Sequence, residues 1–196
     1  THSHEFGFEI DTVKRCPPFI DAMGKGFLMP LAVDLHVEDG QFSWEWDPPV
    51  PTVGDYNRAP IGFHSAEQLA GSPYFADDTF AVKFMTFWTI TLPTGWGLLC
   101  THPSNRDDLP FRTLTGFVHA DNYENFIHFP ALWTDASFSG TLPHGTPVAQ
   151  CYPVPHEALE LVTETLTGDA AERFRATKSN VRQSEGTYRR DHRSGS

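Results

Sequence analysis

Histidines and carboxylates that could do chemistry lie close together in the segment TGFVHADNYENFIHFPALWTD. His119 and Asp121 form an H-x-D pair, a spacing known from iron-dependent oxygenases. Alternate residues of a β-strand point to the same face, so both side chains could bind one ion. The candidates for a third ligand are His102, His128 and His144. Two interpretations stay open, a metal site and a polar pair at the end of a strand.

None of the three further histidines has a spacing typical of a known ligand set. We therefore expect His119 and Asp121 to lie at a strand end and to face a cavity, without a tightly bound metal and without a cofactor. The alternative cofactor is Fe(II), held by the H-x-D pair.

A second group of polar residues lies in the segment THPSNRDDLPF, which two prolines stiffen. Arg106 in this segment is one of only seven basic residues before position 173. It either forms an ion pair with Asp107 or Asp108, or binds an anionic group through its two-pronged guanidinium. Both alternatives stay open.

Three functions are compatible with these residues. The first, which we prefer, is an enzyme that acts on a small polar or anionic metabolite by acid/base chemistry, in a pocket at one end of a β-barrel. The others are a non-catalytic binding or phage-type assembly protein and a metal-dependent oxygenase that uses the H-x-D pair. The expected catalytic residues are His102, His119 and Asp121, and the expected substrate-binding residues are Asn105, Arg106, Tyr123 and His128.

Short segments rich in aromatic and β-branched residues, separated by 16 Pro and 15 Gly, are typical of an all-β domain. Residues 27–46 predict a hairpin around Asp39-Gly40, and residues 80–103 predict another around a Pro-Thr-Gly turn. Three more strands are expected in FRTLTGFVHA, NFIHFPALW and TPVAQCYPV. The predicted fold is mainly β, an antiparallel β-sandwich or β-barrel of the β-clip or jelly-roll kind, with a C-terminal helical tail.

Two segments depart from the strand pattern. Residues 48–79 form a Pro- and Gly-rich insertion, in which one short helix is expected after Ser65 as its N-cap. From Pro155 the pattern is helical, with one helix up to Gly168 and a second, basic one after it. We expect a β domain over residues 1–155 and a helical basic tail over residues 156–196.

Gln150 lies in the strand-like segment GTPVAQ among apolar neighbours. A buried amide needs hydrogen-bond partners and often fixes a neighbouring loop. A structural role is therefore predicted for it.

The charge is unevenly distributed along the chain. Residues 1–172 carry 7 basic and 23 acidic side chains, a net charge of −16, whereas residues 173–196 carry 7 basic and 2 acidic ones, a net charge of +5. An acidic body repels phosphate backbones, so we expect no nucleic acid to bind to it. The basic tail is expected to contact the acidic body, a second copy in a homo-oligomer or another protein, in preference to phosphate.

The longest uncharged run, residues 84–105, is broken by a proline and two glycines, and it predicts strands rather than a membrane span. Cys16, Cys100 and Cys151 are odd in number and lack a C-x-x-C motif, which is typical of buried thiols in a reducing cytosol. A cytoplasmic protein is expected. Motifs for nucleotide binding, for a hydrolase nucleophile and for a zinc protease are absent from the sequence.

Three long segments carry a resemblance to a known family: CPPFIDAMGKGFLMPLAVDLHVEDG, THPSNRDDLPFRTLTGFVHADNYENFIHFPALW and GTLPHGTPVAQCYPV. Together they resemble an uncharacterised family of β-rich proteins from bacteria and tailed phages. The resemblance covers most of residues 16–155. It implies a β-rich fold and no particular activity.

The order PSNRDDLPFRTLTGFVHADNY followed by GTPVAQCYPV is also similar to the dUTPase-like β-clip fold. His119 stands where that family has its catalytic Asp, Asn122 is an extra residue, and Pro147 replaces an Arg. These departures argue against dUTP hydrolysis. The matching positions are Arg106, Gly116, Asp121, Tyr123, Gly145 and Gln150.

Overall fold

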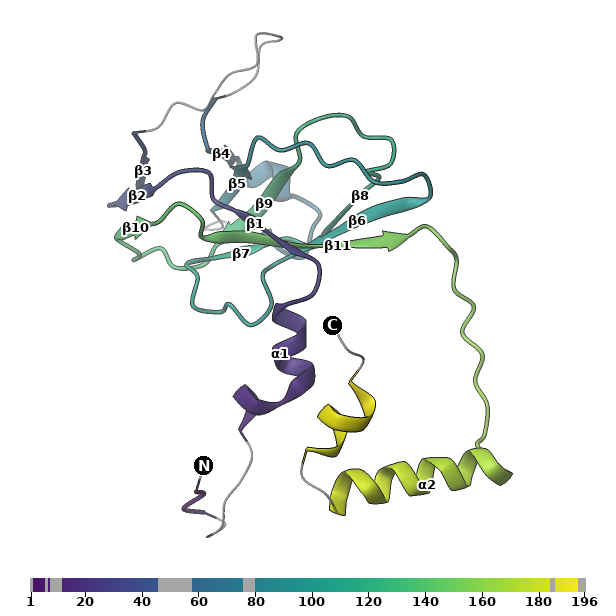
Figure 1. Ribbon diagram of the computed structural model, residues 1–196. Helices are drawn as coiled ribbons and strands as arrows, with labels where there is room; N and C mark the ends of the chain where they lie inside the picture. Colours follow the sequence, from purple (N-terminus) through teal and green to yellow (C-terminus); the bar gives the residue numbers. More distant parts are fainter. Residues whose placement is uncertain are drawn as a thin grey trace. The chain divides into compact units, whose positions relative to one another are not determined.

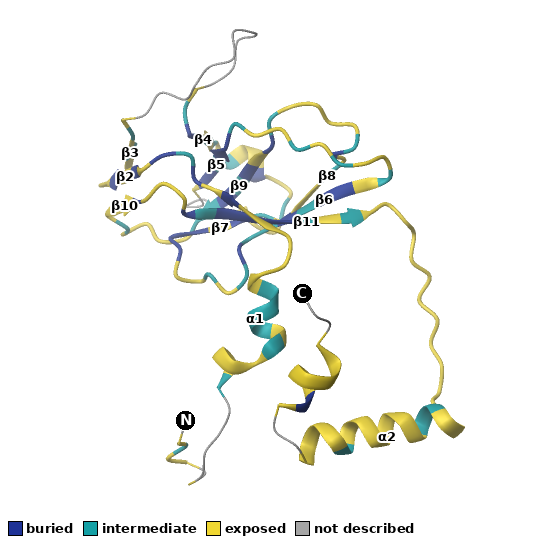
Figure 2. Cartoon of the chain, in the orientation of Figure 1, coloured by how far each residue is buried: buried dark blue, intermediate teal, exposed yellow. Residues whose placement is uncertain are grey.

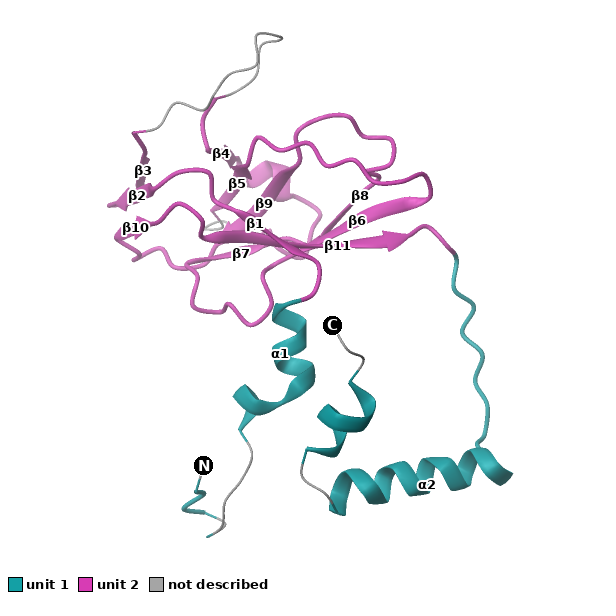
Figure 3. Ribbon diagram, in the orientation of Figure 1, with its two compact units in different colours: residues 1–24, 158–196 teal, residues 25–157 magenta. Residues whose placement is uncertain are grey.

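The computed structural model describes residues 2–5, 7, 12–45, 58–75, 80–183 and 186–193 (Figure 1). The chain divides into two compact units, which Figure 3 shows in different colours. One unit is residues 25–157, and the other combines residues 1–24 with residues 158–196.

The described strands all belong to the unit of residues 25–157 and pair in an antiparallel manner into three sheets. The β6 sheet has the order β1 (Phe27–Pro30), β11 (Pro147–Pro155), β6 (Trp96–Thr101) and β8 (Gly116–Val118). The β5 sheet has the order β4 (Ile61–His64), β5 (Ala81–Met85), β9 (His128–Trp133) and β7 (Phe111–Thr113). The β2 sheet has the order β10 (Gly140–Leu142), β2 (Leu35–Glu38) and β3 (Gln41–Ser43).

Buried residues of all three sheets form one hydrophobic core, and Figure 2 colours the buried residues dark blue. Phe84, Phe111 and Phe129 are its largest fully buried side chains, and Leu35 and Leu98 join them from the other two sheets. The prediction of a mainly β, antiparallel chain with a C-terminal helix is confirmed. The strands of the described residues form three separate sheets rather than one closed barrel.

The hairpin predicted around Asp39-Gly40 is confirmed, because β2 pairs with β3 across this turn. Both turn residues have positive φ, 48° and 74°, as a tight two-residue hairpin turn requires. Leu35 and Val37 point into the core, as their alternation predicted. Position 46, the end of the predicted hairpin, lies outside the described residues.

The hairpin predicted over residues 80–103 is wrong. β5 pairs with β4 and β9, whereas β6 pairs with β11 and β8 in another sheet. The predicted turn itself exists, since the Trp96 N–H donates to the Pro93 carbonyl over 3.1 Å. The chain before this turn is anchored elsewhere, because the Leu92 N–H donates to the Ala120 carbonyl over 3.0 Å. It therefore passes from one sheet to the next instead of folding back.

The predicted insertion contains more regular structure than the sequence indicated. β4 lies within it, and so does a short 3-10 helix, Ala66–Leu69. The helix start predicted at Ser65 is confirmed, with the Ser65 N–H donating to the Gln68 side chain over 2.9 Å. Most of the rest of the insertion, residues 48–57 and 76–79, lies outside the described residues.

The second unit is helical. It contains a 3-10 turn (Val13–Arg15), α1 (Pro17–Met23), α2 (Gly168–Gln183) and a π-helical turn (Tyr188–His192). α2 confirms the helix predicted after Gly168. None of the described helices is both long and apolar enough to cross a membrane.

The helix predicted from Pro155 is wrong. Pro155 is the last residue of β11, where it lies opposite Trp96, and residues 156–167 form neither helix nor strand. Strand pairing with β6 fixes the chain in an extended form up to this point. The following segment contains Thr163, Thr165 and Thr167, which favour helix weakly. Leu159 and Leu161 remain 91% exposed.

Candidate metal site

His119, Asp121 and His156 come together in the unit of residues 25–157. Each offers one ligand atom, and these three atoms lie within 4.8 Å of one another. The rings of His119 and His156 meet edge to face, with their centroids 5.0 Å apart. Nδ1 of His156 lies 3.8 Å from Oδ2 of Asp121. The structure thus supplies a second histidine to the H-x-D pair.

The end of β8 positions the first two of these residues. His119 follows Val118 directly, and the next residue, Ala120, is only 1% exposed. The Ala120 N–H donates to the Val118 carbonyl over 2.8 Å, which turns the chain. Because the residue between them is buried, His119 and Asp121 are both directed away from the core. The two side chains therefore lie on one side of the chain, at a turn just after the strand and not within it.

Gly95, the residue just before β6, holds Asp121 and His156 in place. Its N–H donates to Oδ2 of Asp121 over 2.9 Å, and its carbonyl accepts from the N–H of His156 over 2.8 Å. β6 lies between β8 and β11, so ligands from the ends of both outer strands meet over the central one. A single residue therefore sets the distance between Asp121 and His156.

Gly97 makes room for the cluster. It lies in β6 opposite Val154 of β11, on the face turned away from the buried Leu98. A Cβ atom at this position would lie 2.1 Å from the Phe117 ring and 2.8 Å from Nε2 of His156. The absence of a side chain at Gly97 thus lets both rings lie over the sheet.

The donor set is suited to a transition-metal ion. Two imidazoles and one carboxylate are the ligands of the facial triad of non-haem Fe(II) oxygenases, and catalytic zinc sites use a similar set. Donors that share one ion at about 2.1 Å lie about 3.0–3.4 Å apart, so the three groups need to approach by roughly 1 Å. Asp121 and His156 are 13% and 30% exposed, which leaves their side chains room to do so.

His156 was missed in the sequence because it belongs to no motif with His119. It lies 35 positions beyond Asp121, and only the register of β6 with β8 and β11 brings the residues together. One signal was present. Tyr152, Val154 and His156 are alternate residues, so a strand predicted to continue past Pro155 would have had the histidine on the same face as the other two.

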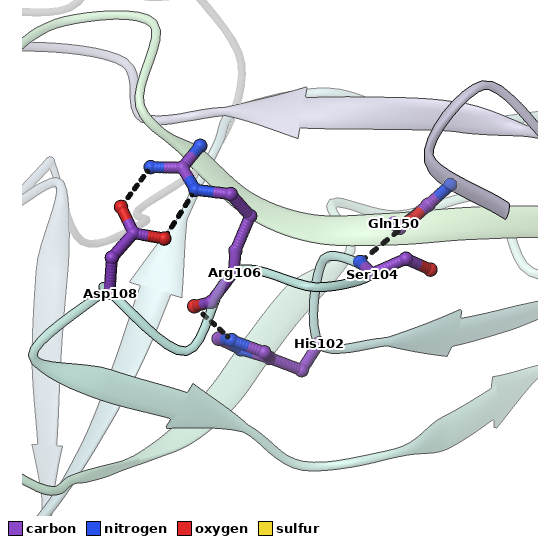
Figure 4. A network of polar contacts seen from close by, with 5 residues as sticks. All are labelled: His102, Ser104, Arg106, Asp108 and Gln150. Atoms are coloured by element: carbon purple, nitrogen blue, oxygen red, sulfur yellow. Dashed lines mark hydrogen bonds and ion pairs between the residues drawn. The ribbon is translucent and has the colours of Figure 1, made fainter. Parts of the chain in front are cut away.

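His102, the other expected acid/base residue, has a structural environment (Figure 4). Nδ1 accepts from the Thr113 N–H over 3.1 Å, so it carries no proton and Nε2 is the donor. Nε2 lies 3.0 Å from the Arg106 carbonyl and donates to it. Both ring nitrogens are thus occupied by backbone groups.

Arg106 forms the ion pair that the sequence left open as one alternative. Nε and Nη2 donate to the two carboxylate oxygens of Asp108 over 2.7 and 2.9 Å (Figure 4). This hydrogen bonding lowers the pKa of Asp108 and raises the pKa of Arg106. The guanidinium fork that could hold an anion is engaged by a neighbouring residue.

Gln150 has the structural role predicted for it. Its side chain is 1% exposed, and its Oε1 accepts from the Ser104 N–H over 2.8 Å (Figure 4). Its Nε2 donates to the Lys25 carbonyl over 2.7 Å. This amide joins the loop after β6 to the start of β1.

The remaining expected site residues are spread over the unit. Asn105 lies in the same loop as Arg106 with a positive φ of 60°, and Tyr123 is exposed after the turn at Asp121.

His128 begins β9 opposite Met85, and its burial, with Lys83 nearby, lowers its pKa. The backbone N–H of His144 donates to the Asp34 carboxylate. Of the histidines proposed as a third ligand, none belongs to the cluster found among the described residues.

Comparisons with known proteins add no family. No protein-family model matches the chain, and no curated protein sequence matches it either.

Proposed function

We propose that the protein binds a divalent transition-metal ion through His119, Asp121 and His156 and uses it to bind and activate a small polar or anionic molecule. The convergence of three ligand atoms within 4.8 Å carries this proposal. Fe(II) is the preferred ion, because two histidines and one carboxylate are the donor set of non-haem iron enzymes. Oxygenase chemistry is therefore favoured over metal-free acid/base catalysis.

The small-molecule part of the proposal follows from coordination and charge. Three protein ligands leave coordination positions open for water or for a substrate oxygen. A bound divalent ion would create a local positive charge on a body whose residues 1–172 have a net charge of −16. Anionic or strongly polar molecules would be attracted to this position in preference to the rest of the surface.

The metal can be tested directly on the full chain. Protein stripped with a chelator is titrated anaerobically with Fe(II), and separately with Co(II) as a spectroscopic probe. We expect one ion per chain, and affinity reduced about 100-fold or more in His156→Ala and Asp121→Asn. Asp121→Asn is informative because its amide oxygen can still accept from Gly95 while the charge is lost.

His144→Ala is the matched control, since it removes an exposed histidine outside the cluster. It should bind the ion as the unchanged chain does. Equal affinity in the unchanged chain and in His156→Ala, with both folded by circular dichroism, would refute the site.

A second candidate function is protein–protein assembly, favoured by residues 158–167. Leu159 and Leu161 are 91% exposed there, and Val162 and Leu166 are exposed as well. Several exposed aliphatic side chains within so short a segment support a contact surface there. Sedimentation velocity of the full chain should show concentration-dependent self-association that Leu159→Ser/Leu161→Ser weakens. A monomer at every concentration, in both proteins, would argue against a homo-oligomer.

For the fold, we propose a sandwich of the β-clip or jelly-roll kind. Its support is that three antiparallel sheets contribute side chains to one core. An experimental structure with a different strand connectivity would contradict this assignment.

A further inference from the structure

Cys100 and Cys151 lie opposite each other in the two central strands of the β6 sheet. Their Sγ atoms are 3.7 Å apart, and both residues are buried, with 4% and 0% exposure. Directly paired residues of antiparallel strands have Cα atoms about 4.5–5.5 Å apart, which lies within the range of about 4.4–6.8 Å found for disulfides. The backbone therefore already has the spacing that a disulfide needs.

From this geometry we propose that Cys100 and Cys151 are an oxidation site, which a small peroxide converts into an intramolecular disulfide. Rotation of the two side chains about χ1 is the main movement required, because the paired strands hold the Cα atoms in place. The third cysteine, Cys16, is exposed and belongs to the other unit. The Cys100–Cys151 pair shares no residue with the proposed metal site, and its oxidation does not depend on a bound ion.

The reaction balances with one peroxide molecule for the two thiols. The Cys100 thiolate attacks one oxygen of hydrogen peroxide, the O–O bond breaks, and hydroxide leaves and takes up the thiol proton as water. This gives a sulfenic acid at Cys100. The Cys151 sulfur then attacks that sulfur, the S–O bond breaks, and a second water leaves with the Cys151 proton. The two sulfurs lose two electrons, which the peroxide receives.

The contacts of the pair indicate which thiol reacts first. The S–H of Cys151 donates towards Sγ of Cys100, and this hydrogen bond lowers the pKa of Cys100 and raises that of Cys151. A thiolate forms more readily at Cys100, and the thiolate is the nucleophile. Cys151 is then the resolving thiol. Peroxide is small enough to enter on local opening of the sheet, which makes the reaction slow.

The disulfide would tie β6 to β11 in the interior of the core. Thr101, the end of β6, and Gln150 are the adjacent pair, so the link also supports the loop that Gln150 holds. A cross-link over this sequence separation restricts the unfolded chain, so oxidation should raise the unfolding midpoint by roughly 5 °C or more.

The test uses the full chain in a chelator, so that metal-catalysed oxidation is excluded. After exposure to hydrogen peroxide, the protein is denatured without reductant, alkylated and analysed by intact mass and peptide mapping. We expect two thiols to escape alkylation, a mass loss of about 2 Da and a single Cys100–Cys151 cross-linked peptide. The variant Cys16→Ser should give the same product, because only the buried pair remains in it.

Cys151→Ser is the matched control, in which Cys100 has no resolving partner and should accumulate sulfenic or sulfinic acid. If that variant does not fold, the peptide map of the Cys16→Ser protein decides alone. Full alkylation of both thiols after prolonged oxidation would overturn the proposal. So would a sulfinic acid at Cys100 beside a free Cys151 in the protein that retains both residues.

Discussion

Two regions of the β6 sheet each place a histidine beside ionic residues, and they differ in how these groups are satisfied. In the loop after β6, backbone groups occupy both ring nitrogens of His102, and Asp108 occupies the Arg106 guanidinium. At the opposite end of the strand, three ligand atoms of the cluster around His119 converge within 4.8 Å. Within the described residues, the ring nitrogens of His119 make no hydrogen bond.

The difference separates a structural polar group from a candidate site. A donor and an acceptor that already satisfy each other have little free energy to gain from a ligand, and breaking their contact costs free energy. In the cluster, Asp121 accepts one hydrogen bond from the Gly95 N–H, and a cation could bind it together with both imidazoles. Residue types alone suggested similar chemistry in both regions. The hydrogen-bond partners indicate a structural role for the loop after β6, and they are compatible with the metal binding that we propose for the cluster around His119.

Among substitutions that leave the three ligands in place, the largest expected effect comes from filling the space at Gly97. In Gly97→Ala the new Cβ would meet the Phe117 ring and Nε2 of His156, so both rings must move off the sheet. We expect metal affinity to fall by about 10- to 100-fold, the size of effect seen when groups that orient metal ligands are removed. The fold should survive, because the exposed Phe117 ring can rotate away. Calorimetric titration with Co(II) measures the change.

Gly116→Ala is the matched control, since a Cβ there would meet no atom within 4 Å. It should leave metal affinity unchanged. The double variant Gly97→Ala/Phe117→Ala removes the larger of the two clashes and should recover part of the affinity. Unchanged metal binding in Gly97→Ala would show that this glycine does not position His156.

The next largest effect is expected at His102, where the free energy of unfolding should change. His102→Ala leaves the Thr113 N–H and the Arg106 carbonyl without their partner. For a partly exposed loop we expect a loss of about 1–2 kcal/mol in the free energy of unfolding. Metal affinity should stay the same. Urea unfolding and Co(II) titration of the same preparation test both statements.

His156→Ala provides the contrast, with lost metal binding and little change in stability without metal. If His102→Ala weakened the metal instead, the loop would belong to the site after all. The two regions would then share one function.

Several features of the fold and of the two regions could be predicted from the sequence, and others could not. The alternation of Leu35 and Val37 with polar residues predicted a hairpin, and the H-x-D spacing predicted that His119 and Asp121 lie on one face. Both predictions rest on local patterns. The role of Gln150 also followed from its apolar neighbours. These predictions needed only the geometry of a single strand or turn.

Predictions that depended on long-range pairing failed or were missing. The strands before and after the Pro93 turn were assigned to one hairpin, although hydrogen bonds to distant residues send them into different sheets. His156 joined the cluster through the register of β11 on β6, which no local spacing encodes. The choice between the two alternatives for Arg106 depended on one rotamer, which the sequence leaves open.

The smallest expected effect is that of Arg106, and it bears on the part of the comparison that concerns charge. The guanidinium is 37% exposed and paired with an Asp108 carboxylate that is 63% exposed, and exposed pairs of this kind contribute little. Arg106→Ala should therefore lower the free energy of unfolding by less than about 1 kcal/mol, and Arg106→Lys by less still. The loss should shrink further in high salt, which screens an exposed pair.

Because the lowered pKa of Asp108 depends on Arg106, any stabilisation is present at neutral pH and disappears as the pH falls through the range in which Asp108 is protonated. Urea unfolding at neutral and acidic pH measures this, with Arg112→Ala as a control for loss of an exposed arginine.

Neither Arg106 variant should alter the binding of a small anion to the metal-loaded protein. A marked loss of anion binding in Arg106→Lys, with stability unchanged, would mean that the guanidinium leaves Asp108 to hold a ligand, and the loop would then be a second half of the site.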